Sequence, residues 1–189
     1  MKHLFVAALM GALAVALPLS AAEMGDDGLH KADWMKDTFK DLREDLEEAS
    51  AEGKRLMVII EQRGCIYCKK MHEEVFPQPE VASLLNDDYF VVQLNMFGDV
   101  EITDFDGESL TEKEAMAKWG VLFTPTMMFF PEEVEEGVPA NRAAIATMPG
   151  AFGKFTTVNL LQWVLDHGYE GDEPFQKYHA RMLETQMQQ

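Results

Sequence analysis

The chain holds only two cysteines, Cys65 and Cys68. Two residues separate them in the stretch EQRGCIYCKKM, residues 61–71. Cysteines at this spacing can form a redox-active disulfide, supply part of a metal site or close a small structural loop. A structural disulfide across two intervening residues would restrain little of the unfolded chain, so it is the least favoured of the three. Redox chemistry and metal binding are the alternatives that the rest of the sequence must separate.

A metal site would need ligands beyond the two cysteines. His72 follows Cys65 by seven residues and Cys68 by four, so on a helix all three side chains would share one face. Structural zinc normally takes four ligands, and the chain has no second cysteine pair. Metal binding or metallochaperone work through these three residues is therefore the alternative function. The favoured redox function predicts no bound metal and no cofactor, with His72 on the helix surface.

The position of the cysteine pair predicts different roles for its two members. The apolar, β-branched run RLMVII at residues 55–60 is typical of a buried strand, and the pair follows it closely. Cys65 should therefore lie at a strand-to-helix turn, with Cys68 inside a helix that extends to residue 75. The positive end of this helix and the two lysines after Cys68 would stabilise a Cys65 thiolate. We expect Cys65 to attack a substrate disulfide and Cys68 to resolve the mixed disulfide.

The remaining periodicity predicts alternating strands and helices around this motif. Apolar residues at three- and four-residue spacings favour an amphipathic helix over residues 32–52. An Asp-Gly pair predicts the turn of a small hairpin over residues 100–110. Thr111 and Glu114 form a capping-box pattern that starts the next helix. The other expected elements are strands at 89–96, 124–130 and 142–148, and helices at 79–87, 156–168 and 172–187.

Four stretches of the sequence resemble the thioredoxin superfamily. They are GCIYCKKM (64–71), the pair Leu94-Asn95 at the end of a strand, AKWGVLFTPTMMFF (117–130), and the pair Pro149-Gly150 before a helix. The stretch ITDFDG (102–107) is similar to hairpins of the SoxW-like group, exported thioredoxin-like proteins associated with bacterial sulfur oxidation. The resemblance implies an α/β thioredoxin fold, in which a mixed central sheet is flanked by helices. An inserted hairpin and N- and C-terminal helical extensions would complete it.

The resemblance also implies which residues would surround the cysteines. Pro125 is expected to be the cis-proline that faces the disulfide, with the Thr124 backbone binding an extended substrate strand. Tyr67 is expected to shape the substrate groove. Thioredoxins keep a buried carboxylate as a proton relay six residues before the first cysteine, where this chain has Ile59. Glu61 takes over that position if the intervening loop is shorter, and otherwise it is a solvated loop residue.

The first 22 residues have the pattern of a secretory signal peptide, with Lys2, an apolar run and the small residues Ser20-Ala21-Ala22. The apolar run is shorter than the roughly 20 residues that span a bilayer, which disfavours a retained anchor. We therefore expect cleavage near Ala22, a periplasmic location and no stable membrane insertion after processing. The expected organisation is a signal peptide (1–22), a thioredoxin-like domain (23–171) and a C-terminal helical tail (172–189).

The net charge of the chain and its single-domain organisation limit the kinds of partner that we expect. The formal net charge of −17 at pH 7 disfavours binding to nucleic acid or to anionic membranes. Thr124 before the proline resembles periplasmic reductants and isomerases, and the absence of a dimerisation segment favours a monomeric reductant. The expected substrates are protein disulfides, with sulfur-oxidation carrier proteins among the candidates. The expected electron donor is a membrane thiol transporter.

Overall fold

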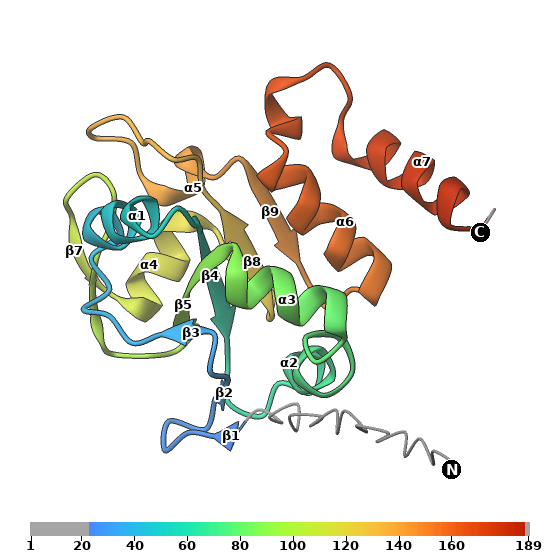
Figure 1. Cartoon of the computed structure of the whole chain (residues 1–189). Helices are drawn as coiled ribbons and strands as arrows, with labels where there is room; N and C mark the ends of the chain where they lie inside the picture. The colour runs from blue at the N-terminus through green and yellow to red at the C-terminus, as the bar shows by residue number, and fades with distance from the viewer. Residues whose placement is uncertain (1–22, 188–189) are drawn as a thin grey trace, which may run out of the picture.

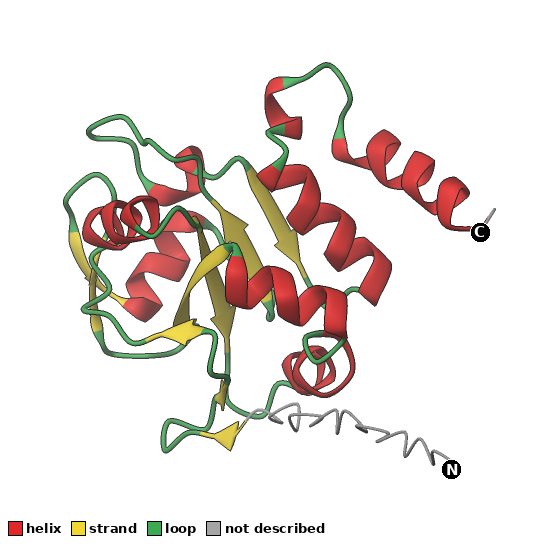
Figure 2. Ribbon diagram, in the orientation of Figure 1, coloured by secondary structure: helices red, strands yellow, loops and turns green. Residues whose placement is uncertain are grey.

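The computed structural model describes residues 23–187, and its centre is a five-stranded mixed sheet. Strands β3, β5 and β4 run parallel to one another, whereas β8 and β9 are antiparallel to their neighbours. Helices cover both faces of this sheet, which confirms the predicted α/β thioredoxin fold (Figures 1 and 2). The strand order is β3 (Met35–Lys36), β5 (Tyr89–Asn95), β4 (Arg55–Glu61), β8 (Thr126–Phe129) and β9 (Ala146–Pro149).

The central strand β4 is buried on both faces, as its continuous apolar sequence predicts. Its alternate side chains enter two separate cores, and Glu61 continues the row of Met57 and Ile59. Glu61 therefore lies on the face that carries the helix after the cysteines. That face is covered by α2 (Ile66–Lys70), α3 (Pro79–Asp87) and α6 (Lys154–Leu165), and the other by α1 (Leu42–Ala51), α4 (Glu112–Trp119) and α5 (Ala140–Ala143).

The helix that carries the cysteines changes its winding after one turn. Helix α2 continues into η1 (Met71–Val75), a π-helical turn in which the Phe76 N–H donates to the Met71 carbonyl oxygen at 2.8 Å. The predicted helix over residues 68–75 is thus present, and α3 begins at Pro79 as expected. Cys68 and His72 both face the sheet from this helix, because both are buried and lie four residues apart.

The predicted helix over residues 32–52 is wrong in its first half. Helix α1 begins only at Leu42, because the Asp41 side chain accepts the first free backbone N–H groups and Lys40 has a left-handed φ of 59°. The preceding residues are extended instead. They form the hairpin of β1 (Glu23–Met24) and β2 (His30–Lys31), followed by β3, which pairs with β5 at the sheet edge. The N-terminal extension is therefore made of strands and not of helix.

The later elements mostly follow the sequence pattern. The inserted hairpin of β6 (Glu101–Thr103) and β7 (Ser109–Thr111) is present, and Thr111 and Glu114 form the predicted capping box of α4. The predicted strand at 142–148 is wrong at its start, because α5 occupies its first residues and β9 begins at Ala146. The short helix η2 (Gly168–Glu170) links α6 to the predicted tail helix, α7 (Phe175–Met187).

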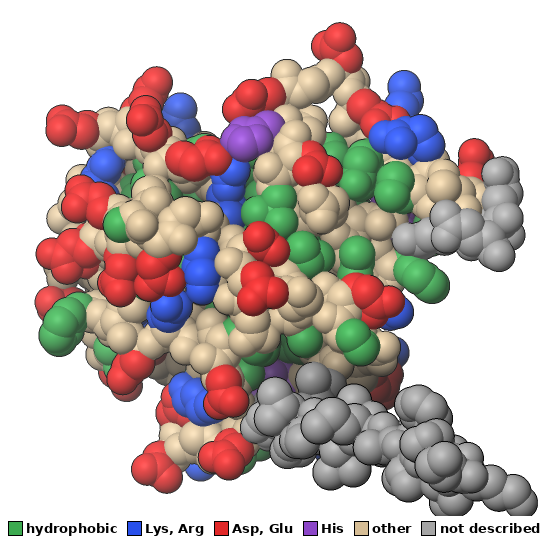
Figure 3. Space-filling view, viewed as in Figure 1, with side chains coloured by type: hydrophobic (Ala, Val, Ile, Leu, Met, Phe, Trp, Pro, Cys, Tyr) green, Lys and Arg blue, Asp and Glu red, His purple; other side chains and the backbone are tan. Residues whose placement is uncertain are grey.

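The tail helix packs on the body of the protein. The Phe175 ring meets the Trp163 ring of α6 with centroids 5.8 Å apart, and α7 runs beside α6 in Figure 1. Acidic side chains are spread over the face in Figure 3, with fewer lysines and arginines between them. Among residues 23–187 there is no helix with the length and apolar character needed to cross a membrane. The expected signal peptide lies outside the described residues.

Candidate active site

Cys65 and Cys68 are joined by a disulfide at the start of α2. Gly64 supplies the left-handed turn, with φ 72°, that leads from the end of β4 into the helix. Cys65 is the residue that caps the helix, and its Sγ accepts the Cys68 backbone N–H at 3.0 Å. Cys65 is 8% exposed, whereas Cys68 is 1% exposed. A substrate approaching from solvent therefore meets Cys65 first.

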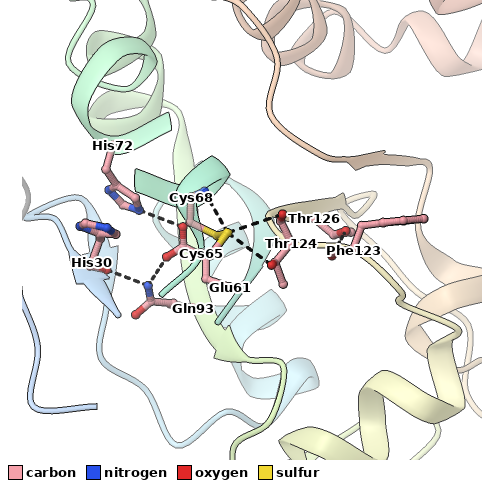
Figure 4. The surroundings of a disulfide bond; sticks show 9 residues. All are labelled: His30, Glu61, Cys65, Cys68, His72, Gln93, Phe123, Thr124 and Thr126. Atoms are coloured by element: carbon pink, nitrogen blue, oxygen red, sulfur yellow. Dashed lines mark hydrogen bonds and ion pairs between the residues drawn. A yellow bond between two sulfur atoms is a disulfide. The ribbon is translucent and has the colours of Figure 1, made fainter. Parts of the chain in front are cut away.

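Thr124, the residue before Pro125, lies against this sulfur, as the resemblance implies. The peptide bond between them is cis. The Thr124 carbonyl oxygen lies 3.6 Å from Cys65 Sγ, and the Thr124 hydroxyl group donates to the same sulfur at 3.3 Å (Figure 4). The loop before β8 and the start of α2 thus converge on Cys65. A substrate strand that hydrogen-bonded to the Thr124 backbone would be held beside this sulfur.

The Glu61 side chain is buried, 1% exposed, and is not a solvated loop residue. Its two carboxyl oxygens each have a partner: Oε1 lies 3.0 Å from His72 Nε2, and Oε2 accepts from the Gln93 side-chain amide at 2.6 Å. In Figure 4 the Glu61 carboxyl group lies on the side of the disulfide that faces His72 and Gln93. Ile59, the other candidate position, is part of the apolar core.

The N-terminal hairpin completes this cluster from outside. Lys31 Nζ donates to the Gln93 side-chain oxygen at 2.6 Å, and the Gln93 amide also donates to the His30 carbonyl oxygen at 2.7 Å. The His30 ring stacks on the His72 ring with centroids 4.9 Å apart. Partial burial, and then the nearby His72, lower the pKa of His30 below its usual value. Four elements, β2, β4, β5 and η1, therefore build one polar cluster around Glu61.

The expectation that His72 lies on the helix surface is wrong. His72 is 2% exposed, and its ring is enclosed by the rings of His30, Trp34 and Phe76. Its Nε2 is engaged with Glu61, so it does not join the two sulfurs as a third ligand. The described residues also contain no group of three or more His, Cys, Asp and Glu side chains arranged to hold a metal ion. This geometry disfavours the metal-binding alternative.

Exposed apolar side chains stand on both segments that form the site, the turn between the cysteines and the loop before Thr124. Tyr67, the one that the sequence singled out, is 58% exposed on the turn between the cysteines, next to Ile66 at 72%. Leu122 and Phe123, directly before Thr124, are 76% and 63% exposed. Large apolar side chains exposed together on a soluble domain are typical of a binding surface. The sequence carries a signal for the last two, since VLF stands immediately before the Thr-Pro pair, where a loop is expected.

A cavity of about 400 Å³ lies between Cys65 and the N-terminal hairpin. Met24 and Gly28 of the hairpin region line it together with His30, Cys65 and Ile66. A larger hollow of about 800 Å³ lies between β9, α6 and the start of α7, and its lining includes neither cysteine. The cavity beside Cys65 is therefore the one that matters for redox chemistry, and the N-terminal hairpin supplies one of its walls.

Comparison with known proteins agrees with this geometry. Residues 42–141, more than half of the chain, match the thioredoxin-like domain family. The chain belongs to this family. A thioredoxin-fold protein from Helicobacter pylori is similar in structure, with a TM-score of 0.53 at 14% identity, covering 68% of this chain and 80% of that one. A thioredoxin from Thermus thermophilus gives a TM-score of 0.50 at 22% identity, covering 66% and 84% of the two chains.

The comparison with curated proteins gives no match. The family and the Cys-x-x-Cys pair together support thiol–disulfide oxidoreductase activity in general. The family match begins at residue 42, so the hairpin and β3 lie before the shared domain. His30, Lys31 and Gln93 were not singled out from the sequence, and His72 was considered only as a metal ligand or a helix-surface residue. These four residues come from three separate parts of the chain.

Proposed function

We propose that this protein is a periplasmic thiol–disulfide oxidoreductase that reduces disulfides in other proteins. The observation that carries the proposal is the unequal access of the two sulfurs. Cys65 stands at the mouth of the site, between Thr124 and the exposed apolar side chains, while Cys68 is buried behind it. A pair arranged in this way can attack with one thiol and resolve with the other, which is what dithiol exchange requires.

The proposed reaction has two exchange steps. The Cys65 thiolate attacks one sulfur of a substrate disulfide, a mixed disulfide forms, and the other substrate sulfur leaves as a thiolate that takes up a proton. Cys68 then loses its proton and attacks Cys65 Sγ, which releases the second substrate sulfur. Two electrons pass from the cysteine pair to the substrate, and the protein is left with its Cys65–Cys68 disulfide. These steps need no metal and no cofactor.

Glu61 is the proposed acceptor of the Cys68 proton. It lies on the sheet face that α2 covers, and Figure 4 draws its carboxyl group on the side of the disulfide that faces His72 and Gln93. Thr124 and Pro125 are proposed to bind the substrate backbone, and Tyr67 to contact its side chains. The exposed apolar rim favours a protein substrate over a small polar disulfide, because it offers area for a polypeptide to cover.

The protein would have to be reduced again after each turnover. We propose that a membrane thiol transporter supplies the two electrons and that the protein acts as a monomer. Sulfur-oxidation carrier proteins are candidate substrates, on the strength of the ITDFDG hairpin and its resemblance to the SoxW-like group. Cys65 would be the contact point for both the donor and the substrate, because it is the outer sulfur.

The direction of electron flow can be tested by equilibrating the protein with glutathione redox buffers. The fraction of oxidised protein is read from thiol alkylation and mass spectrometry. A reductant should give a potential below about −200 mV, since it must pass electrons to stable disulfides. A potential near the roughly −120 mV of a strong periplasmic oxidant would contradict the proposed direction.

Export can be tested separately on protein purified from its natural host. The proposed cleavage after Ala22 predicts an N-terminus at Glu23, which N-terminal sequencing would detect. An N-terminus at Met1 on the folded, abundant form would contradict the periplasmic location. This result would not affect the proposed redox activity, which is tested separately.

A further inference from the structure

We propose that His72, Gln93 and Lys31 are positioning residues for Glu61, so that the N-terminal hairpin region forms part of the redox site. The inference rests on the proposed function and deepens it. Glu61 and Gln93 lie within the matched domain, whereas Lys31 lies before it. The hairpin would therefore be an added part that this chain uses to hold the proton acceptor of a thioredoxin-like site.

The orientation of the Gln93 amide is the first piece of evidence. A glutamine amide can present either its oxygen or its NH₂ group, and only the NH₂ group can donate to the Glu61 carboxylate. Lys31 has donors only, so its bond to the Gln93 oxygen fixes that oxygen on the outer side. The His30 carbonyl oxygen accepts one proton of the NH₂ group, which leaves the other for Glu61 at 2.6 Å. The hairpin region thus turns the Gln93 donor toward Glu61.

The His72 ring is the second piece of evidence. Its Nδ1 is buried and has no hydrogen-bond partner among the described residues, while its Nε2 lies against Glu61 Oε1. A ring with a proton on Nε2 makes a bond to the carboxylate, whereas the tautomer without it would set a lone pair against the carboxylate. His72 therefore acts as a donor to Glu61. The surrounding rings of His30, Trp34 and Phe76 prevent this imidazole from turning away.

The charged side chains near the cluster include Lys31, Asp27, Lys69 and Glu73. Lys31 is shared with Asp27, whose carboxylate lies 2.7 Å from the same Nζ. On the helix side, Lys69 and Glu73 form an exposed pair at 3.7 Å. The His30 ring stacks on the His72 ring, and partial burial lowers the pKa of His30. Lys31 is therefore the cation linked to Glu61 through a hydrogen-bonded path, with Gln93 as the bridge.

This arrangement predicts where its loss would appear in the reaction. Both oxygens of Glu61 are held by donors, so the carboxylate keeps one position while it accepts the Cys68 proton. The Cys68 thiolate then attacks Cys65 Sγ, and the substrate sulfur leaves with the bonding electron pair. Loosening Glu61 should slow this second exchange step relative to the first. The defect should shrink at high pH, where solvent removes the thiol proton without help.

The two steps can be separated with one equivalent of an aromatic nitrobenzoate disulfide reagent, which releases one coloured thiolate per step. Reduced full-length protein releases the first when Cys65 attacks and the second when Cys68 resolves. Lys31→Met and His72→Phe should each slow the second release relative to the first by about tenfold near pH 7, with the difference lost above about pH 9. Lys36→Met is the matched control, because Lys36 pairs with Glu52 away from the site.

Three outcomes decide the matter. A Lys31→Met profile equal to that of Lys36→Met at every pH would overturn the inference, and Lys31 is exposed enough for this variant to fold even if His72→Phe does not. Slowing by the same factor at all pH values would also overturn it, because a general disturbance would not depend on the thiol proton. Failure of the unaltered protein to release the second thiolate would instead refute the proposed function itself.

Discussion

Glu61 and Asp104 are both fully buried carboxyl groups, yet the structure holds them in different ways. Asp104 accepts from the backbone N–H groups of Phe105 and Ala140 and from the Trp119 indole, at 2.7 to 2.8 Å. The Lys118 ammonium also lies 2.8 Å from it. Among the described residues, Glu61 has no backbone donor and no lysine or arginine in direct contact, only the side chains of His72 and Gln93.

The difference separates a structural carboxylate from one suited to proton transfer. Backbone donors and a directly paired ammonium hold the Asp104 carboxyl group in place, and these contacts tie the inserted hairpin to α4 and α5. Burial alone would lower the pKa of Lys118, but its hydrogen bonds to Asp104, Asp106 and Glu108 have the larger effect. The net result is a raised pKa, so the ammonium stays charged. Glu61 is held by an imidazole and an amide side chain instead, with no ammonium or guanidinium group in direct contact with it among the described residues.

The largest effect that this comparison predicts is on stability at Asp104. Asp104→Asn should lower the free energy of unfolding by about 3 kcal/mol, because it leaves a buried donor without an acceptor and weakens the Lys118 pair. Urea unfolding followed by tryptophan fluorescence measures the loss. Asp106→Asn on the same lysine is the control and should cost under about 1 kcal/mol, since that pair is more exposed. Equal losses would refute the structural role of Asp104.

At Glu61 the effect should fall on the reaction instead. Glu61→Gln keeps the shape but removes the proton acceptor, so reduction of a protein disulfide should slow by about a hundredfold near pH 7. The free energy of unfolding should fall by about 1 kcal/mol, less than for Asp104→Asn, because no ammonium is paired with Glu61 and the His72 ring can change tautomer to accept from the new amide. A variant with full activity would remove Glu61 from the mechanism. A variant that unfolds as readily as Asp104→Asn would make it a structural group.

Asp45 of α1 is another buried carboxyl group, and it extends the comparison because only one of its two oxygens has a hydrogen-bond partner in the part of the chain that the structure describes. One of its oxygens has no partner among the described residues, and burial raises its pKa from 3.8 to about 6. The folded state therefore resists ionisation of Asp45, and stability falls as the pH rises from about 4 to 6. Asp45→Asn should raise the free energy of unfolding by about 1–2 kcal/mol at pH 7.

The pH dependence of this gain is its check. Below about pH 4 the Asp45 carboxyl group is protonated in the folded state, so the advantage of asparagine should disappear there. Thermal unfolding of both proteins across pH 4–7 measures the difference. A gain that did not depend on pH would mean that the substitution acts through packing and not through the charge. The redox reaction should be unaffected, since Asp45 lies on the opposite face of the sheet from Glu61.

The core of the fold could be predicted because its signals are local. The run RLMVII, the cysteine pair directly after it and the capping box of α4 each lie within a few residues. The N-terminal strands could not be predicted in this way. Trp34, Met35 and Phe39 fit a helical period, but Met35 and Lys36 form a strand only by pairing with β5, more than fifty residues later. Tertiary pairing overrode the local pattern.

The polar cluster escaped prediction for a similar reason. Lys31 and Gln93 meet across 62 positions of sequence, and His72 reaches Glu61 only because the helix folds back over β4. A partial signal was present. Gln93 is a polar residue inside the apolar strand YFVVQLN, and Glu61 ends the apolar strand RLMVIIE. Buried polar residues usually have partners, so two of them near the same end of adjacent parallel strands could have indicated a cluster.

The most direct test of the redox assignment is a trapping experiment with the two single-cysteine variants. Cys68→Ser keeps the outer sulfur and lacks the resolving thiol, so after incubation with oxidised substrate protein it should hold a mixed disulfide through Cys65. Cys65→Ser should hold none, because its remaining thiol is buried. Non-reducing electrophoresis and mass spectrometry of the linked peptide measure both. Trapping by Cys68→Ser alone is the expected result, and equal trapping by the two variants would contradict the roles assigned to the two cysteines.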